Sequence, residues 1–424
     1  MTEMDTILAA PTTASAKPAA TAKAIFSNTP GMPGIFKSNF DYQVVRAMCT
    51  GAYGDGGAIG EVYSTARCVA DGDIEGWIVA WRGTAERVER IARDCLSGGH
   101  FVSAREAFLR ASTYWKTGQF YTDGKDPRQL EMLKRHRACF IEAARLFDPP
   151  VESVSIPYEN GKTLPGYFMC ADANGPRPTV MIIGGGDTTS EELYYWGGGA
   201  AAVRRGYNAF LWDGPGQVGA YALDTSLTYR PDWEVPTRYA VDYVLSRDDV
   251  DPKRLALSGH SFGGYFAPRA AAYEKRITAV IANSLIPECK PVLMAMIGLD
   301  PNEPYDKDLE SKINLSDPLN ELFVTAFKDR MGLSGQSLAA FCDSLGGYSL
   351  AGLENKITCP LLYISCEGEG PLVAAAGHKF FEKLTCAKTE RLLRIVDGSE
   401  IHCALNNPSL KHQIEFDWLD EVFK

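Results

Sequence analysis

Residues 255–265 constrain the fold of this chain more than any other stretch of the sequence. The apolar residues 255–257 predict a short buried strand, and the alanine-rich residues 265–273 predict a helix. Between them, residues 259–263 have the pattern Gly-X-Ser-X-Gly, whose two glycines permit a very tight turn around the central serine. Such a turn holds the serine hydroxyl clear of the sheet, so we interpret Ser261 as a nucleophile.

The amino-acid composition limits the classes of partner and the cellular setting. With 424 residues the chain is long enough for two domains. A net charge of −10 and the lack of a basic run argue against nucleic acid and anionic membrane surfaces as partners. Eleven cysteines, an odd number without Cys-X-X-Cys pairs, indicate reduced thiols and neither a disulfide framework nor a metal site. We expect no secretory signal and no membrane span, and therefore a cytoplasmic protein without a metal or organic cofactor.

The sequence pattern divides the chain into three parts. Residues 1–30 are predicted to be poorly ordered, residues 31–150 to form a helical lid domain, and residues 151–424 to form a catalytic domain. In the third part, predicted strands alternate with helices, which indicates a mostly parallel sheet covered on both faces. A hairpin is expected first, and residues 301–353 are expected to be a helical excursion. The expected strands are 151–156, 162–169, 179–183, 207–212, 254–257, 279–282, 359–365 and 390–396.

A serine nucleophile needs a base, and one of the six histidines has a suitable position. His402 lies in the loop after the last predicted strand, at the end of the sheet where such folds carry their reacting groups. The remaining histidines fall in predicted helices or within the serine turn itself; they are His100, His136, His260, His378 and His412. We therefore interpret His402 as the base.

The acid that would orient this base is expected in the loop after residues 360–365. That loop contains no aspartate but two glutamates, Glu367 and Glu369. Glutamate can orient an imidazole as aspartate does, with one more methylene of reach. Counting along the strand favours Glu369, and Glu367 is the alternative, either as the acid or as a substrate-binding group.

A glycine-rich turn supplies candidate donors for an oxyanion hole. Gly184, Gly185, Gly186 and Asp187 directly follow the strand at 179–183, and glycines there let backbone amides approach a substrate closely. We assign the donors to Phe262 and to Gly186 or Asp187. A phosphate-binding loop is excluded because no Lys-Ser/Thr pair follows the glycines. The turn at 213–217 is interpreted as architecture.

Four further polar residues are candidates for substrate binding. Arg230 and Asp232 form one group, and a pocket position would let them orient a carbonyl or a phenol. Arg110 and Tyr114 share one helix face in the helical region, as residues of a lid would. The alternatives are surface charges for the first pair and a structural contact for the second.

The motifs together resemble the α/β-hydrolases with an N-terminal helical domain, which include dihydroxypseudooxynicotine hydrolase and the fungal pigment-pathway hydrolases that shorten polyketide chains. The resemblance covers about residue 36 to the C-terminus. It implies an α/β-hydrolase fold with an all-helical lid, and often a homodimer. Ser261 then matches the nucleophile and His402 the base, while Glu369 stands where the family has aspartate. The motifs that carry it are 184–187 with Glu191-Glu192, 213–217, 230–234, 259–264, and Asp397-Gly398 before His402-Cys403.

The resemblance implies hydrolysis of a carbon–carbon bond next to a ketone, in an aromatic or polyketide-like small molecule. The same three residues could instead serve an esterase, lactonase, thioesterase or acyltransferase. A third alternative is a ligand-binding protein or a non-hydrolytic cyclase on a hydrolase scaffold. We expect a serine hydrolase, because a nucleophile, a base and an oxyanion turn are all present in the sequence.

Overall fold

The computed structural model describes residues 34–171, 175–296, 299 and 318–424. The segment expected to be poorly ordered, residues 1–30, lies outside these ranges. The first described part is helical, as expected, and no strand occurs in it before Glu152. Its helices are α1 (Phe40–Cys49), α2 (Gly51–Gly54), α3 (Ile59–Ala66), α4 (Ile74–Ser97), α5 (Phe101–Gln119) and α6 (Pro127–Ala144).

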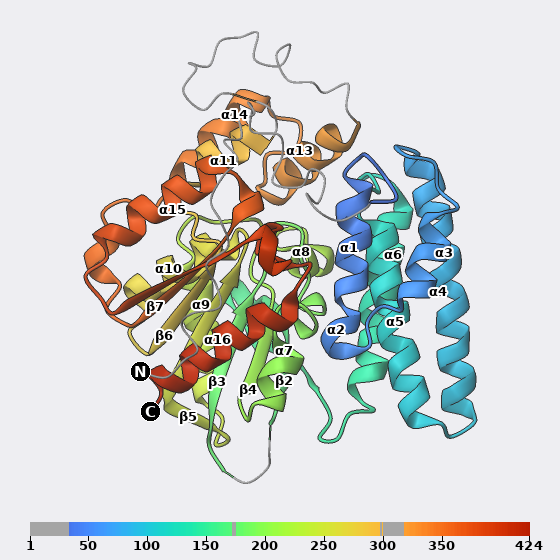
Figure 1. The fold of residues 1–424 in the computed structure, drawn as a ribbon, viewed down its shortest axis with the longest axis horizontal. Coiled ribbons are helices and arrows are strands. Elements are labelled where there is room, and N and C mark those ends of the chain that lie inside the picture. The colour runs from blue at the N-terminus through green and yellow to red at the C-terminus, as the bar shows by residue number, and fades with distance from the viewer. Residues whose placement is uncertain (1–33, 172–174, 297–298, 300–317) are drawn as a thin grey trace.

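Local sequence explains where the long helices begin. The Asp73 carboxylate accepts a hydrogen bond from the Gly76 amide at 2.9 Å, which caps the start of α4. Helix α6 starts in the same way, with Asp126 accepting from Arg128 N at 2.8 Å. The inner face of α4 buries Trp77 completely, within a core that joins α4 to its neighbouring helices. The helical region is therefore a folded unit with its own apolar core (Figure 1).

The second part forms one sheet of eight described strands in the order β1-β2-β4-β3-β5-β6-β7-β8. The predicted hairpin is confirmed, since β1 pairs with β2 antiparallel, and β2 pairs antiparallel with β4. All other neighbours are parallel, as the alternating pattern predicted. The strands are β1 (Glu152–Pro157), β2 (Thr163–Met169), β3 (Arg177–Ile183), β4 (Asn208–Trp212), β5 (Val250–His260), β6 (Ala279–Asn283), β7 (Leu361–Cys366) and β8 (Lys388–Leu393).

The two faces of the sheet belong to two different cores. Side chains alternate along a strand, so Ile182 packs in one core and Met181 in the other. The first core contains residues of α7 (Gly199–Arg204), of α16 (Pro408–Val422) and of the N-terminal helices. The second contains residues of α9 (Glu234–Leu245) and α10 (Gly263–Tyr273). The helical region thus shares its core with one face of the sheet.

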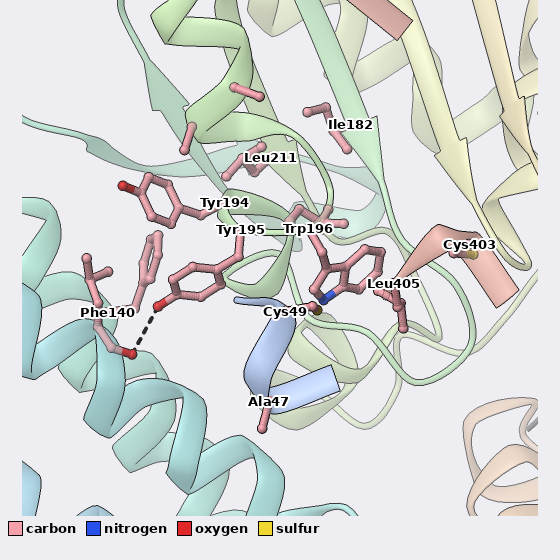
Figure 2. Close-up of a cluster of buried hydrophobic side chains, with 14 of the residues drawn as sticks. Ala47, Cys49, Phe140, Ile182, Tyr194, Tyr195, Trp196, Leu211, Cys403 and Leu405 are labelled. Carbon is pink, nitrogen blue, oxygen red and sulfur yellow. Dashed lines mark hydrogen bonds between the residues drawn. The ribbon is translucent and has the colours of Figure 1, made fainter. Parts of the chain in front are cut away.

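Aromatic side chains connect the helical region to the sheet. Figure 2 shows Tyr194 and Tyr195 beside Phe140 of α6, and Trp196 on the other side of Tyr195, beside Leu405. The Tyr195 hydroxyl donates to the Leu109 carbonyl of α5 at 3.0 Å. This contact fixes the chain just after the glycine turn against the helical region.

A further group of helices lies beyond the carboxyl ends of the parallel strands (Figure 1). The expected excursion at 301–353 is helical in its described part, while residues 301–317 lie outside the described ranges. This group and the N-terminal helices surround the sheet end where the candidate site lies. No described helix has the length and the continuous apolar character that crossing a bilayer requires. The helices of this group are α11 (Cys289–Met296), α13 (Pro318–Arg330), α14 (Leu338–Ser344) and α15 (Pro371–Lys383).

Candidate active site

Ser261 occupies the tight turn that the sequence predicted, between β5 and α10. Its φ of 59° lies in the left-handed region, which residues with side chains rarely adopt. A Cβ at Gly259 would stand 2.0 Å from the Gly263 carbonyl oxygen, and one at Gly264 would stand 1.5 Å from the Ser284 oxygen. Only glycine therefore allows the strand and the helix to approach this closely around the serine.

Ser261, His402 and Glu369 form a continuous chain of hydrogen bonds. The Ser261 Oγ lies 2.8 Å from His402 Nε2, and His402 Nδ1 lies 2.6 Å from Glu369 Oε1. His402 and Glu369 are both buried, and Ser261 is half-buried. The three residues come from the turn after β5, the segment after β8 and the turn after β7, respectively. A hydroxyl, an imidazole and a carboxylate are thus aligned at the carboxyl end of the sheet.

The structure separates the two glutamates, of which the sequence favoured Glu369 and kept Glu367 as the alternative. Glu369 is the last residue of a single 3-10 turn, Glu367–Glu369, and its side chain folds back toward the sheet. Its Oε2 accepts from Cys366 N at 3.2 Å, and its Oε1 also accepts from the Ser284 hydroxyl. Glu367 is exposed, and its carboxylate accepts from Ile395 N at 2.8 Å. The structure therefore brings Glu369, and not Glu367, to the imidazole.

The surroundings of His402 change its affinity for a proton. Burial alone would lower its pKa, but the contacts with Cys403 and Glu369 outweigh burial and raise the pKa well above the ordinary 6.5. The neighbouring His260 is the opposite case, because burial lowers its pKa well below that value. His402, unlike His260, thus has a carboxylate partner that favours its charged form.

The glycine turn after β3 approaches the serine directly. A Cβ at Gly185 would stand 2.6 Å from Ser261 Cβ, so a side chain there would cover the hydroxyl. Gln217 Nε2 donates to the Gly184 carbonyl at 2.8 Å, and Arg330 Nη1 donates to the Gly186 carbonyl. In a planar trans peptide the C=O and the following N–H point in opposite directions. The Asp187 N–H is therefore directed away from Arg330.

Gln217 and Arg330 were not identified as site residues from the sequence. Gln217 belongs to the turn at 213–217, which the sequence assigned to architecture; its contacts show that this turn also fixes the glycine turn. Arg330 carried no sequence signal. Its guanidinium is buried beside the Phe327 and Tyr229 rings, and Tyr229 Oη donates to the same Gly186 carbonyl at 3.4 Å. Together these groups hold the backbone next to Ser261 in one orientation.

Two adjacent cavities lie at this end of the sheet. The smaller one, about 40 Å³, contains Ser261 and His402 in a mostly apolar wall; we call it the serine cavity. The larger one, about 320 Å³, is lined from both the helical region and α13; we call it the interface cavity. Asp187 and Phe323 line both, so the two cavities are neighbours. The other side chains of the serine cavity are Phe262, Ile286, Cys289, Val292, Leu293 and Phe327.

The predicted oxyanion residues lie in the serine cavity, but the Asp187 side chain has another partner. Gly186, Asp187 and Phe262 line this cavity together with Ser261. The Asp187 carboxylate accepts from Arg46 Nη1 of α1 at 2.7 Å. Burial would raise the pKa of this carboxyl, yet the Arg46 guanidinium lowers it below its ordinary value. The carboxylate therefore stays ionised and anchored to the helical region.

Arg230 and Asp232 are not among the residues that line the serine cavity or the interface cavity, so a role in substrate binding stays a prediction. They pair with each other at 2.7 Å, and Arg230 also donates to Glu159 and Tyr158. The cause is local: the two residues are two positions apart, so the guanidinium and the carboxylate pair with each other. Asp232 is half-buried and serves as the ion-pair partner of Arg230.

Arg110 and Tyr114 share a helix face as predicted, but that face turns toward α3 and not toward a cavity. Both contact the same carboxylate oxygen, Glu61 Oε2, at 3.1 and 2.7 Å. The Tyr114 hydroxyl also accepts from Ala58 N at 2.9 Å. The alternative of a structural contact, left open by the sequence, is the arrangement that the structure has.

A mostly parallel sheet with helices on both faces and a serine turn after β5 defines an enzyme of the α/β-hydrolase fold, as predicted. The chain belongs to the FrsA-like esterase family, whose model matches residues 75–295. Among the described residues no group of three or more His, Cys, Asp or Glu side chains is arranged to hold a metal ion.

Fungal hydrolases are among the relatives in sequence. Hydrolase LUC6 of a Fusarium species is 32% identical, over 92% of this chain and 98% of that protein. The α/β hydrolase xenA of Xenoacremonium sinensis is 37% identical, over 57% of this chain and 59% of that protein. The 20-hydroxy-prefusarin hydrolase FUS2 of Gibberella moniliformis is 36% identical, over 59% of this chain and 62% of that protein. The last two matches thus span about three fifths of those relatives.

Solved structures share the same architecture. The 2,6-dihydroxy-pseudo-oxynicotine hydrolase superposes with a TM-score of 0.70 at 22% identity, over 89% of this chain and 95% of that one. AbyA5 superposes with a TM-score of 0.60 at 16% identity, over 85% of this chain and 90% of that one. The family resemblance inferred from the motifs is confirmed by these comparisons, and with it the helical N-terminal region followed by an α/β-hydrolase sheet.

Proposed function

We propose that this protein is a serine hydrolase that cleaves a carbon–carbon bond next to a ketone, in an aromatic or polyketide-like substrate, through an acyl-enzyme. The observation that carries the proposal is the hydrogen-bonded chain from Ser261 Oγ through His402 to Glu369. The substrate class is supported by the relatives, since the names of two of them specify hydrolysis of prefusarin and pseudo-oxynicotine derivatives.

In the first half-reaction the Ser261 oxygen attacks the ketone carbonyl carbon and His402 Nε2 takes the hydroxyl proton. Glu369 holds Nδ1 and stabilises the imidazolium. The N–H groups of Phe262 and of Gly186 or Asp187 stabilise the negative oxygen of the tetrahedral intermediate. The carbon–carbon bond then breaks, its electron pair leaves as an enolate, and the proton held by His402 returns to the leaving group.

In the second half-reaction a water molecule attacks the acyl-enzyme. His402 accepts one proton of this water, the ester bond to Ser261 breaks, and the proton returns to the serine oxygen. The sum is one water consumed, one carboxylic acid formed and one shorter ketone released. The mostly apolar wall of the serine cavity suits the acyl group during this step, and the Asp187 carboxylate in that wall is paired with Arg46.

The alternative is an esterase, lactonase, thioesterase or acyltransferase that uses the same residues. The family description, esterase, favours this reading. An alkoxide or thiolate needs less help to leave, since the proton held by His402 suffices, whereas an enolate needs a further stabilising group. A homodimer and a cytoplasmic location remain predictions of the sequence.

Two measurements on purified protein test the proposal. A fluorophosphonate probe is expected to label the wild-type chain and not Ser261→Ala, while the exposed-site control Ser246→Ala labels normally. Benzoylacetone is expected to be split into a carboxylic acid and a ketone, and Ser261→Ala is expected to lower this rate on the order of 10⁵-fold. Turnover of phenyl acetate without cleavage of benzoylacetone would replace the proposal by its alternative. Full activity of the Ser261→Ala protein would contradict both the proposed function and its alternative.

A further inference from the structure

Lys116 is a buried cation of the helical region that the triad does not use. It lies on α5, its side chain is 5% exposed, and it lines the interface cavity. Glu192 Oε2 is 3.8 Å from its Nζ, an ion pair too long for a hydrogen bond. Among the described residues no hydrogen-bond acceptor within range of Nζ is found. Its Nζ lies 5.2 Å from the centre of the Phe120 ring, which lines the same cavity, so the ammonium keeps N–H donors for a ligand there.

The carboxylates near Lys116 are already bound by other groups. Arg46 Nε donates to Glu192 Oε1 at 2.8 Å, and Arg46 Nη1 donates to Asp187 at 2.7 Å. Thr189 N donates to the second oxygen of Glu192 at 3.1 Å. Because one guanidinium holds both carboxylates, Lys116 is left with the longer, 3.8 Å contact to Glu192.

Unpartnered oxygens surround the same cavity. Gln119 lies one turn after Lys116 on α5, so the two side chains share a helix face. Its buried Oε1 has no hydrogen-bond partner, and neither has the buried Oδ1 of Asn39. Both residues line the interface cavity. Each oxygen has a free acceptor site, and a turn of its side chain toward the cavity would let it accept a hydrogen bond from a polar ligand.

We propose that Lys116, assisted by Gln119, binds an ionised enol or phenol oxygen of the substrate in the interface cavity. The inference rests on the proposed function and deepens it, because it names the group that the substrate carries beyond the scissile carbonyl. The ammonium pairs with the anionic oxygen, while the Gln119 and Asn39 oxygens accept hydrogen bonds from neighbouring hydroxyls of the ligand.

The position of the subsite fits the chemistry at Ser261. Asp187 and Phe323 line both cavities, so one extended molecule can place its carbonyl at the serine and its acidic oxygen near Lys116. Burial lowers the pKa of Lys116 against the opposing effect of Glu192. A bound anion offsets this cost, and the ammonium in turn stabilises negative charge on an enolate. Asp329 also lines the cavity, where its carboxylate accepts from the Ser334 hydroxyl.

Binding to full-length Ser261→Ala protein tests the subsite without requiring turnover. Benzoylacetone is the first ligand, and its dimethyl derivative, which has no acidic proton between the carbonyls, is the matched control. Lys116→Met is expected to raise the dissociation constant of benzoylacetone by about tenfold or more, and to leave that of the derivative within about twofold. Lys134→Met, the same exchange at an exposed position of α6, is expected to change neither.

Each outcome has a defined meaning. Equal weakening of both ligands, or no weakening of either, overturns the subsite, as does failure of benzoylacetone to bind Ser261→Ala protein. Lys116→Arg, which keeps the charge, is expected to recover part of the affinity that Lys116→Met loses. Loss of turnover has a separate readout in the Ser261 experiment. A selective loss of binding in a protein that cleaves no ketone would therefore reject the reaction and keep the subsite.

Discussion

The serine cavity and the interface cavity touch, yet they are built in different ways. The serine cavity is lined by backbone and by apolar side chains that lie at strand ends or on α11 and α13. The interface cavity is lined by Lys116 and Gln119 of the helical region on one side and by Tyr221 and Arg330 on the other. In our proposal the reaction takes place in the serine cavity, and the interface cavity selects the substrate.

This difference teaches where specificity can change. A serine, a histidine and a glutamate held by strand ends keep their geometry as long as the sheet is intact. The interface cavity depends on which side chains α5 presents to it, and these can be exchanged without disturbing the sheet. Reaction and recognition should therefore respond separately to mutation.

The largest effect is expected from Glu369→Gln. A neutral amide cannot stabilise the imidazolium, so kcat should fall on the order of 10³-fold. His402 must be neutral to accept a proton, and its raised pKa places the acidic limb of kcat/KM above about pH 6.5. Removing the carboxylate lowers that pKa, so the limb should move to lower pH. A pH–rate profile with phenyl acetate measures both changes.

Glu367→Gln is the control for that experiment, because Glu367 is exposed and bonds to Ile395 N. Its rate and its pH limb should stay close to those of the wild type. A greater loss from Glu367→Gln than from Glu369→Gln would contradict the assignment of the acid.

Arg330→Met should have a smaller effect on the serine cavity. The exchange removes the donor to the Gly186 carbonyl, so the neighbouring Asp187 N–H is no longer held in one direction. We expect kcat for phenyl acetate to fall roughly 30-fold, with little change in KM, because a misdirected oxyanion donor acts in the transition state. Arg230→Met, at a surface pair, is the control. An equal fall in the two variants, or a change in KM alone, would argue against the positioning role.

Leu293→Ala should have the smallest effect and should sharpen the comparison most. Leu293 lines the serine cavity, so its truncation makes room for a longer acyl chain. The ratio of kcat/KM for phenyl hexanoate over phenyl acetate should rise by about tenfold. Lys116→Met should leave this ratio unchanged, because Lys116 lines the other cavity. An equal change of the kcat/KM ratio in Leu293→Ala and Lys116→Met would show that the two cavities do not have separate roles.

The sequence predicted the groups whose positions depend on strand ends. Ser261 followed from the glycine spacing, and His402 from its place after the last strand; both lie where the sheet brings the carboxyl ends together. Counting along the strand favoured Glu369 but kept Glu367 as the alternative, because a single 3-10 turn decides which side chain folds back. That turn carries no periodic signal.

Contacts between distant segments could not be predicted from the sequence. Arg330 and Gly186 are 144 residues apart, and no spacing rule relates them. Periodicity correctly placed Arg110 and Tyr114 on one face of α5, but it gave no information on which neighbour that face meets. Lys116 is on the same helix and was overlooked, since a lysine inside an amphipathic pattern is usually solvated.

Arg46 sets a condition on how a substrate can arrive. Its guanidinium joins α1 to the two carboxylates at 187 and 192, just beyond the glycine turn, and all three side chains are largely shielded from water. Swinging the helical region away as a lid would strand these charges, at a cost of about 3–5 kcal/mol for a single broken buried pair. The substrate should therefore enter beside α13, while the N-terminal helices stay in place. Truncation of the N-terminal helices, or Arg46→Met, would remove the contact that holds the glycine turn. The active site would then lose this support although Ser261, His402 and Glu369 are all still present.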